Sequence, residues 1–279
     1  MELNSDDVRL TPRLRLGRRL RRLRERKGLS LRQLSERVGG YSHSYLGRVE
    51  LGEQLASEAL VNALDEFFDS DGVLSELLEL AHDTLIPDYS RKVVAKEPEA
   101  ERIQVFNSSH VTALLQTPEY MRAHFRKSQL HDSEEQIEER VAARMKRQRI
   151  LERARPPYYW GIMDEAALRR PIGGRRCMAE QLKHLLQLGG RPRVTVQILP
   201  FDRGAHPILG GSLTLHTLPD GTTIAGVESF DSGESVESPK RVLELTQWFD
   251  VARSLALTDD ESLDLIRTYL KEYEVEDDT

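Results

Sequence analysis

Twelve arginine and lysine residues lie between Arg13 and Arg48, and they supply the strongest chemical signal in the sequence. The same stretch holds only two acids, Glu25 and Glu36, so its net charge is +10, whereas the whole chain of 279 residues has a net charge of −6. Guanidinium and ammonium groups bind phosphate oxygens through charge-assisted hydrogen bonds. A solvated surface helix, the alternative, would normally mix charges of both signs along its faces. The stretch therefore indicates a surface that binds the phosphates of a nucleic acid.

Two short helices joined by a glycine turn are predicted within residues 29–52, which overlap this basic stretch. Ser30 followed three residues later by Gln33 is a capping box, a pattern that begins a helix. Gly39 and Gly40 end that helix, since glycine reaches positive φ without a steric cost. Two helices with so short a turn form a helix-turn-helix, whose second helix fits the major groove of DNA.

The second helix of this motif is predicted to begin after Ser42 and to turn Leu46 and Val49 inward. The residues left on its outer face, which we expect to contact base edges, are His43, Ser44, Gly47 and Arg48. The residues expected to contact phosphates, which position the protein without reading sequence, are Arg18, Arg22, Arg32, Gln33 and Ser42. Tyr45 is expected to pack in the core, and Glu50 is expected to pair within the domain.

The segment LSLRQLSERVGG…SHSYLGRVELG resembles the helix-turn-helix of the XRE family of phage-repressor-like regulators. The resemblance covers about residues 14–85 and implies a five-helix domain that binds double-stranded DNA. The sequence departs from the family at two places. Gly40 and Tyr41 make the turn one residue longer than usual. Leu31 stands where family members often have a glutamine, at the start of the first helix of the motif, and Gln33 lies two residues further along. Because one such module makes few base contacts, we expect a homodimer on an inverted repeat, with half-sites about 34 Å apart.

Length and composition indicate the number of domains, the class of protein and the compartment. A chain of 279 residues suggests two domains, and 39% hydrophobic with 31% charged residues is ordinary for a globular protein. The sequence has no apolar run near the ~18 residues that span a bilayer, and no signal-peptide pattern. We therefore expect a cytoplasmic protein that is associated with the nucleoid when bound to DNA. The single cysteine, Cys177, excludes an internal disulfide and a cysteine-based zinc site.

Composition and the positions of proline and glycine predict four segments. They are a flexible tail at 1–12, a helix-turn-helix domain of about five helices at 13–85, a linker at 86–101, and a mixed α/β effector or dimerisation domain at 102–275. The linker carries two prolines and mixed charges without periodicity. From Val49 onward the net charge is −14, so the second domain has no electrostatic reason to approach DNA.

The second domain is predicted to contain a small sheet flanked by helices. Alternation and turn signals predict strands at 103–106, 158–163, 193–199, 213–218 and 222–227, and helices after residues 117, 133, 164, 176, 238 and 258. The strand–helix–strand part should be a right-handed parallel crossover. The arginine-rich residues 140–155 are expected to form surface pairs with the acidic early turns, and a second DNA-binding patch is the alternative.

Six phrases of this half resemble the C-terminal domain of the actinobacterial WhiJ-like regulators. They are LLQTPEY (114–120), RMKRQ (144–148), DEAALRRPIGG (164–174), VTVQILP (194–200), GAHPILGGS (204–212) and ESLDLI (261–266). The family pairs an XRE-like module with an effector domain, often encoded beside a small partner protein. The resemblance therefore implies a transcriptional regulator. The sequence departs from the family at Thr112 and Ala113, where Pro-Gly is usual, and at Gly226, where an aromatic residue is common.

We expect an effector or partner to bind at the long connection of residues 201–210, because long ordered loops beside a sheet often carry binding sites. An ordinary surface loop is the alternative. The residues expected at this site are Asp202, Arg203 and His206 from the connection, with Arg169, Arg170 and Glu228 converging on it.

The sequence shows none of the catalytic or metal-binding motifs considered below. The eight histidines form no metal-ligand spacing, and no Gly-x-Ser-x-Gly elbow, phosphate-binding loop or Gly-x-Gly-x-x-Gly is present. Cys177 is expected to be a small buried hydrophobe, and the adjacent Asp164 and Glu165 point different ways on a helix. We expect no catalytic residue, metal or cofactor, and a protein that is not an enzyme.

Three hypotheses remain open from the sequence alone. The first is a regulator whose effector domain binds a small partner protein, or an antitoxin-like member of a two-gene module whose main role is that binding. The second is a regulator whose α/β domain binds a metabolite. The third is an enzyme that uses its helix-turn-helix for targeting.

Overall fold

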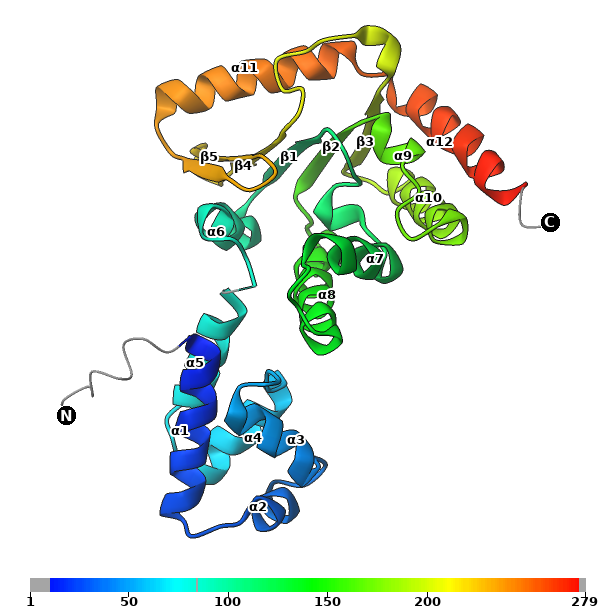
Figure 1. Cartoon of the computed structure of the whole chain (residues 1–279). Coiled ribbons are helices and arrows are strands. Elements are labelled where there is room, and N and C mark those ends of the chain that lie inside the picture. Colours follow the sequence, from blue (N-terminus) through cyan, green and yellow to red (C-terminus); the bar gives the residue numbers. More distant parts are fainter. Residues whose placement is uncertain (1–10, 84, 276–279) are drawn as a thin grey trace. The chain divides into compact units, whose positions relative to one another are not determined.

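A computed structural model describes residues 11–83 and 85–275 of the chain. The chain divides into two compact units, residues 1–87 and residues 88–279, each with its own hydrophobic core. Of the expected tail at 1–12, residues 1–10 lie outside the described part, whereas Thr11 and Pro12 begin the first helix. Both units are drawn in Figure 1.

The first unit is built from five helices in its described residues. They are α1 (Pro12–Arg26), α2 (Leu31–Val38), α3 (His43–Leu51), α4 (Glu58–Phe68) and α5 (Val73–Asp83). Leu16, Leu20 and Leu23 form one buried stripe on α1, as their three- and four-residue spacing predicts. The expected five-helix domain is therefore confirmed.

Close packing of α1 against α3 holds this unit together. A Cβ atom at Gly17 would lie 2.5 Å from the carbonyl oxygen of Val49, so only glycine fits there. Seven residues further along α1, Arg24 donates two hydrogen bonds to Glu50 of α3, from Nε at 2.6 Å and from Nη2 at 2.8 Å. The pair confirms that Glu50 is bound within the domain.

The second unit contains a six-stranded mixed sheet in the order β3-β2-β1-β4-β5-β6. The strands are β1 (Arg102–Asn107), β2 (Tyr158–Asp164), β3 (Val194–Leu199), β4 (Ser212–Thr217), β5 (Thr223–Glu228) and β6 (Gly233–Val236). Strands β1, β2 and β3 are parallel, and the other neighbours are antiparallel. The parallel pairing of β2 with β3 confirms that the expected crossover is parallel. Strand β6 was not predicted, because only Val236 of its four residues is buried.

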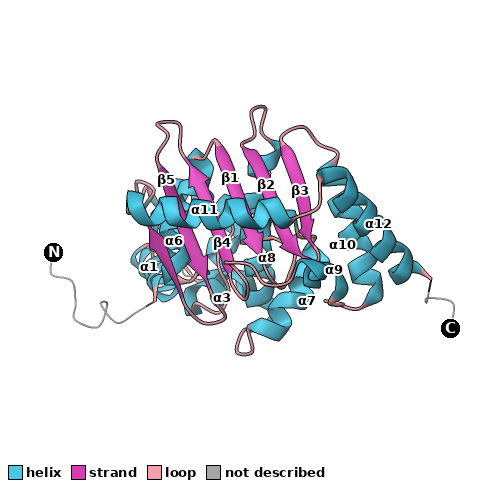
Figure 2. Cartoon of the chain, turned by 90° about the horizontal axis from the view of Figure 1, so that it is seen from above, coloured by secondary structure: helices cyan, strands magenta, loops and turns pink. Residues whose placement is uncertain are grey.

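Helices cover both faces of this sheet. They are α6 (Asp88–Lys96), α7 (Pro118–Ser128), α8 (Glu134–Gln148), α9 (Ala166–Arg169), α10 (Arg175–Gly189), α11 (Pro239–Leu255) and α12 (Asp259–Glu274), with short 3-10 turns η2 (Glu97–Glu99), η3 (Ala113–Leu115), η4 (Arg149–Glu152) and η5 (Phe201–Arg203). Helix α11 lies across the strands on one face, and α6, α7, α8 and α10 lie on the other (Figures 1 and 2). The expected mixed α/β fold is confirmed.

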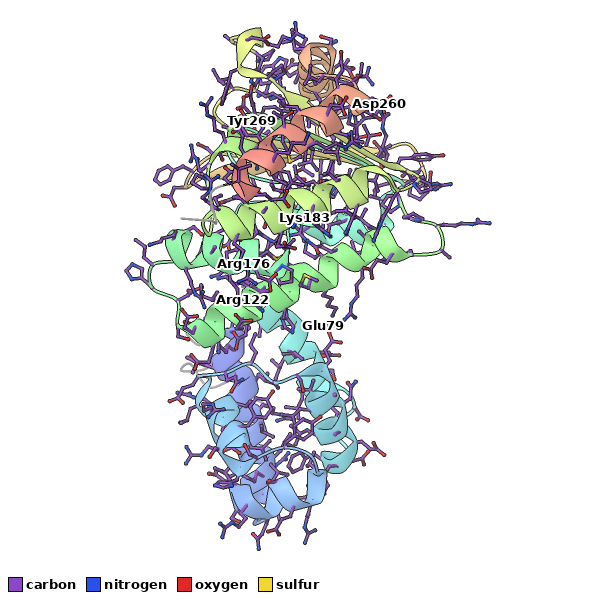
Figure 3. The ribbon with its side chains drawn as sticks, turned by 90° about the vertical axis from the view of Figure 1, so that its right-hand side faces the viewer. Glu79, Arg122, Arg176, Lys183, Asp260 and Tyr269 are labelled. Carbon is purple, nitrogen blue, oxygen red and sulfur yellow. The ribbon has the colours of Figure 1, made fainter. Side chains whose placement is uncertain are left out.

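Helices α10 and α12 pack side by side at the β3 end of the sheet. Lys183 of α10 pairs with Glu274 of α12 at 3.2 Å, and the Tyr269 hydroxyl of α12 donates to Glu165 at 2.5 Å. Figure 3 shows Lys183 and Tyr269 on these two helices. The contacts fix the segment that follows β2 against the last helix.

The expected linker at residues 86–101 is instead largely helical. Ser90, Val93 and Glu97 are buried at spacings of three and four, which is the period of one helix face. Only one of the three is apolar, so the pattern did not stand out in the sequence. Polar contacts replace the missing hydrophobic stripe: the carbonyl of Val93 lies 3.0 Å from His216 Nδ1 of β4, and Glu97 accepts two hydrogen bonds from Arg147 of α8. Helix α6 therefore belongs to the second unit.

The acidic first turns of α8 pair with α7 rather than with the later arginines of α8. Glu138 accepts from Arg122 at 2.6 Å, and Glu134 accepts from Arg126, both on the neighbouring helix. Two of the arginines in residues 140–155 pair with acids outside α8: Arg140 with Asp132, just before the helix, and Arg147 with Glu97.

Candidate functional site

The helix-turn-helix forms as the sequence predicts. The Ser30 hydroxyl accepts from Gln33 N–H, and Gln33 Oε1 accepts from Ser30 N–H at 2.9 Å, which completes the capping box. Gly39 and Gly40 have φ of +70° and +71° and turn the chain. Ser42 caps α3, because its hydroxyl accepts from the backbone N–H of Tyr45 at 3.1 Å.

The outer face of α3 carries three of the residues expected to contact bases. His43 and Ser44 are exposed in its first turn, and Arg48 is exposed one turn later, while Leu46 and Val49 are buried beneath them. Arg48 Nε donates to Gln54 Oε1 at 3.0 Å, so Gln54, three residues beyond the end of α3, sets the direction of the guanidinium group. These side chains can donate to base edges or to phosphate oxygens.

Gly47 differs from these neighbours on α3. A Cβ atom at this position would lie 3.4 Å from Leu31 Cδ1, so the position faces α2 rather than the outer surface. An approach of Gly47 to DNA would therefore involve its backbone alone. The contact distance is an ordinary one, so helix packing does not require glycine here.

Tyr45 holds α3 against the start of α4. Its hydroxyl donates to the Leu55 carbonyl at 3.2 Å and accepts from the Ser57 N–H at 2.9 Å. Its ring packs on the core of the first unit. The expectation that Tyr45 packs in the core is confirmed.

The residues expected to contact phosphates lie on all three of the first helices. Arg32 and Gln33 are exposed in the first turn of α2, and Arg18 and Arg22 are exposed on α1. A shallow depression on α1 is lined by Arg19, Arg22, Glu25 and Arg26. Glu25 pairs with Arg21 at 2.7 Å, and the hydrogen bond from Arg21 lowers the pKa of the Glu25 carboxyl. Most of the basic side chains of the segment are exposed to solvent.

The residues expected at the effector site lie near one edge of the sheet. Strands β1, β2 and β3 end at this edge, β4 begins there, and the segment 200–211 runs along it from β3 to β4. Asp202, Arg203 and His206 belong to this segment, and Glu228 ends β5 beside the start of β4. Arg169 and Arg170 are exposed after β2.

The structure does not bring these residues into one site. His206 is 8% exposed and packs on Phe106 with ring centroids 5.1 Å apart, in the core layer that α11 covers. Neither ring nitrogen of His206 has a hydrogen-bond partner among the described residues, and burial lowers the pKa of the ring. Glu228 faces the opposite side of the sheet, where its carboxylate accepts from the Ser90 hydroxyl of α6. Asp202 and Arg203 pair with each other at 3.6 Å.

Two sequence motifs meet in a contact that sequence reasoning missed. Gln148, from RMKRQ, donates to the carbonyls of Ala113 and Gln116, and Arg144 donates to Gln116 Oε1 at 2.8 Å. Gln181 of α10 donates to the Leu115 carbonyl and accepts from Thr117 N–H. The segment LLQTPEY is therefore held between α8 and α10 by glutamine side chains.

Possible metal ligands and the cysteine were located in the described part of the chain. Within it, no group of three or more His, Cys, Asp or Glu side chains could hold a metal ion. Cys177 is half-buried, and burial raises the pKa of its thiol. No helix among the described residues has the length and apolar character needed to cross a membrane.

Comparison with known families separates the two units. Residues 15–78 match the model of a helix-turn-helix domain, and residues 90–268 match a domain of unknown function, DUF5753. No curated protein and no solved structure matches the chain. The first match supports a DNA-binding regulator of the XRE-like helix-turn-helix type. Because the second match spans well over half of the 279 residues, the chain belongs to the DUF5753 family, with a helix-turn-helix domain ahead of the family domain.

Proposed function

We propose that this protein is a sequence-specific transcriptional regulator of the XRE type that binds an inverted repeat as a homodimer. The observation that carries the proposal is the outer face of α3, where His43, Ser44 and Arg48 are exposed within a segment of net charge +10. The match of residues 15–78 to a helix-turn-helix domain supports it. The protein acts in the cytoplasm, on the nucleoid, without a cofactor and without catalysis.

Base contacts and phosphate contacts have separate roles in this proposal. Arg48 reads a guanine through two hydrogen bonds, and each such contact discriminates by about 1–3 kcal/mol. Gln54 is a positioning residue, because it accepts from Arg48 Nε and holds the side chain in one direction. His43 and Ser44 contact neighbouring bases, and the Gly47 backbone lies close to the DNA. Arg18, Arg22, Arg32, Gln33 and Ser42 contact phosphates.

The second unit adjusts DNA affinity. Its family domain, matched over residues 90–268, is separate from the helix-turn-helix domain, matched over residues 15–78. Its ligand is a metabolite or a small partner protein. Either one acts through its different affinity for the DNA-competent and DNA-incompetent arrangements. Copurification from the native host separates the two, since only a partner protein would be retained as a second polypeptide.

Genome-wide DNA occupancy in the native host tests the proposal. The wild-type chain is compared with a His43→Ala, Arg48→Ala double variant and with Arg267→Ala, an exposed arginine of α12 that pairs with Asp264. We expect sharp peaks that share an inverted repeat for the wild type and for Arg267→Ala, and loss of those peaks in the double variant. Diffuse occupancy by the wild type, or peaks that persist in the double variant, would refute sequence reading by α3.

A further inference from the structure

A group of basic side chains lies where α7 and α8 meet the end of β1. Arg144 of α8, His124 of α7 and His110, three residues after the end of β1, make up this group, which we call the Arg144 cluster. The rings of His110 and His124 are 4.9 Å apart. The Arg144 guanidinium lies 4.6 Å from the centre of the Phe125 ring. All three basic side chains are half-buried and keep some contact with solvent.

Arg144 has no acidic partner in the described part of the chain. Its one hydrogen bond there runs from Nη1 to Gln116 Oε1 at 2.8 Å. The arginines one turn to either side on α8 are both paired: Arg140 with Asp132 at 2.5 Å and Arg147 with Glu97 at 2.8 Å. A half-buried arginine that lacks a counter-charge between two that have one is unusual, since burying an unpaired charge is costly.

The surroundings disfavour the charged forms of the cluster. Burial lowers the pKa of Arg144 to about 9, an effect to which Arg147 and Arg140 contribute and which Glu228 and Glu97 oppose. Burial lowers the pKa of His124 to about 4, with added effects of His110 and Arg144. Burial also lowers the pKa of His110, and the charges of Arg144 and Arg170 act in the same direction.

The hydrogen bonds leave several donors of the cluster without an acceptor among the described residues. The Phe125 ring fixes the plane of the Arg144 guanidinium, and Gln116 occupies one of its nitrogens, so its other N–H groups remain for a second acceptor. His110 Nδ1 bonds to the Val111 carbonyl at 3.1 Å, and its Nε2 lies 3.5 Å from Asn107 Nδ2. The His124 ring makes no hydrogen bond with a described residue. A planar guanidinium held in this way suits the two oxygens of a carboxylate or a phosphate.

The position in the fold fits a ligand site. Strands β1, β2 and β3 are parallel, and β4 runs antiparallel beside β1. Ligands of open α/β sheets bind outside the carboxyl ends of the parallel strands. Asn107 is the last residue of β1, and His110 of the Arg144 cluster follows it by three residues, so the cluster lies at this end.

We propose that the Arg144 cluster binds the carboxylate or phosphate group of a small anionic ligand. Arg144 supplies the charge and two N–H donors, and His124 supplies a further N–H. Gln116 and Phe125 are positioning residues for the guanidinium. The site lies wholly in the second unit, so it does not depend on DNA binding.

Thermal unfolding of the full chain in the presence of simple anions tests this proposal. Inorganic phosphate and acetate are titrated separately against sodium chloride at equal ionic strength and at pH 7.5. At about five times its Kd, a bound anion raises the Tm of a domain of this size by about 2–4 °C. We expect a saturable rise with at least one anion, and the stronger anion identifies the group that the site prefers.

Three variants make the result specific. Arg144→Gln removes the charge and should abolish the saturable rise, whereas Arg140→Gln removes a paired arginine of the same helix and should keep it. Arg144→Lys keeps the charge but loses the planar donor pair, so we expect its half-saturating concentration to rise about tenfold or more. This variant also tests the site if Arg144→Gln fails to fold. A rise of equal size in wild type and Arg144→Gln, or no saturable rise with either anion in the wild type, would overturn the proposal.

Discussion

The buried Arg24–Glu50 pair offers the sharpest test of what holds the recognition helix in place. The side chains are 12% and 5% exposed, and two hydrogen bonds of 2.6 and 2.8 Å join them. In Glu50→Ala, Arg24 would keep its bond to the Leu29 carbonyl at 2.8 Å and a longer contact of 3.8 Å with the exposed Glu25. Its charge would then be largely buried without a hydrogen-bonded counter-charge. Removing one member of such a pair costs about 3–5 kcal/mol.

That loss is large for a five-helix unit, because whole domains are stable by only about 5–15 kcal/mol. Both tryptophans, Trp160 and Trp248, belong to the second unit, so their fluorescence reports that unit alone. Far-ultraviolet circular dichroism reports both units. For Glu50→Ala we therefore expect the part of the dichroism change that comes from the first unit to occur at a lower urea concentration. The fluorescence transition, which reports the second unit, should stay unchanged.

Glu25→Ala is the matched control, since the exposed Glu25 hydrogen-bonds Arg21 of the same helix α1 and lies 3.8 Å from Arg24 without a hydrogen bond to it. Exposed pairs contribute little to stability, so this variant should unfold like the wild type. A double variant, Arg24→Met with Glu50→Leu, should regain most of the loss because no charge remains unpaired. If Glu50→Ala and Glu25→Ala unfold at the same urea concentration, the reasoning from burial is wrong.

Three further predictions concern other parts of the chain. Burial lowers the pKa of His124 to about 4, so between pH 6.5 and 4 the unfolded chain binds a proton that the folded chain does not. The free energy of unfolding of the second unit should therefore fall by up to about 3 kcal/mol as the pH is lowered over this range. A plot of its urea midpoint against pH should be flatter for His124→Asn. Tyr45→Phe removes the acceptor of the Ser57 N–H, so the first unit should lose about 1–3 kcal/mol in urea, and an unchanged midpoint would show that water replaces the hydroxyl. Arg22→Ala should weaken specific and non-specific DNA binding alike and lower the slope of log K against log salt by about one, whereas a change in sequence preference would contradict a phosphate contact.

Local signals in the sequence predicted most of the first unit. Ser30 and Gln33 form a capping box, and Gly39 turns the chain, because each effect depends on residues within one turn. The strands that alternate clearly were predicted as well. Helix α6 and the turn η2 were missed because two of the three buried positions in residues 88–97, Ser90 and Glu97, are polar and bond to partners distant in the sequence.

The Arg144 cluster could not be predicted for a related reason. Its members come from a strand end, from α7 and from α8, and nothing in their spacing shows that the fold brings them together. The absence of a counter-charge beside Arg144 is a property of the packed structure alone. By contrast, His206 was selected from its loop, but its burial against Phe106 follows from the path of that loop along the sheet edge.

Helix α6 decides where the family domain can be cut and rejoined. Val93 of α6 lies against Gly226 of β5, where an added Cβ atom would be 3.2 Å away, and the Ser235 hydroxyl of β6 donates to the Tyr89 carbonyl at 2.5 Å. A fragment that starts at residue 102 would uncover this side of β5 and β6, whereas one that starts at Asp88 would keep it covered. Recombination that gives the family domain a different DNA-binding module should therefore place its joint before Asp88, so that α6 is inherited together with the sheet.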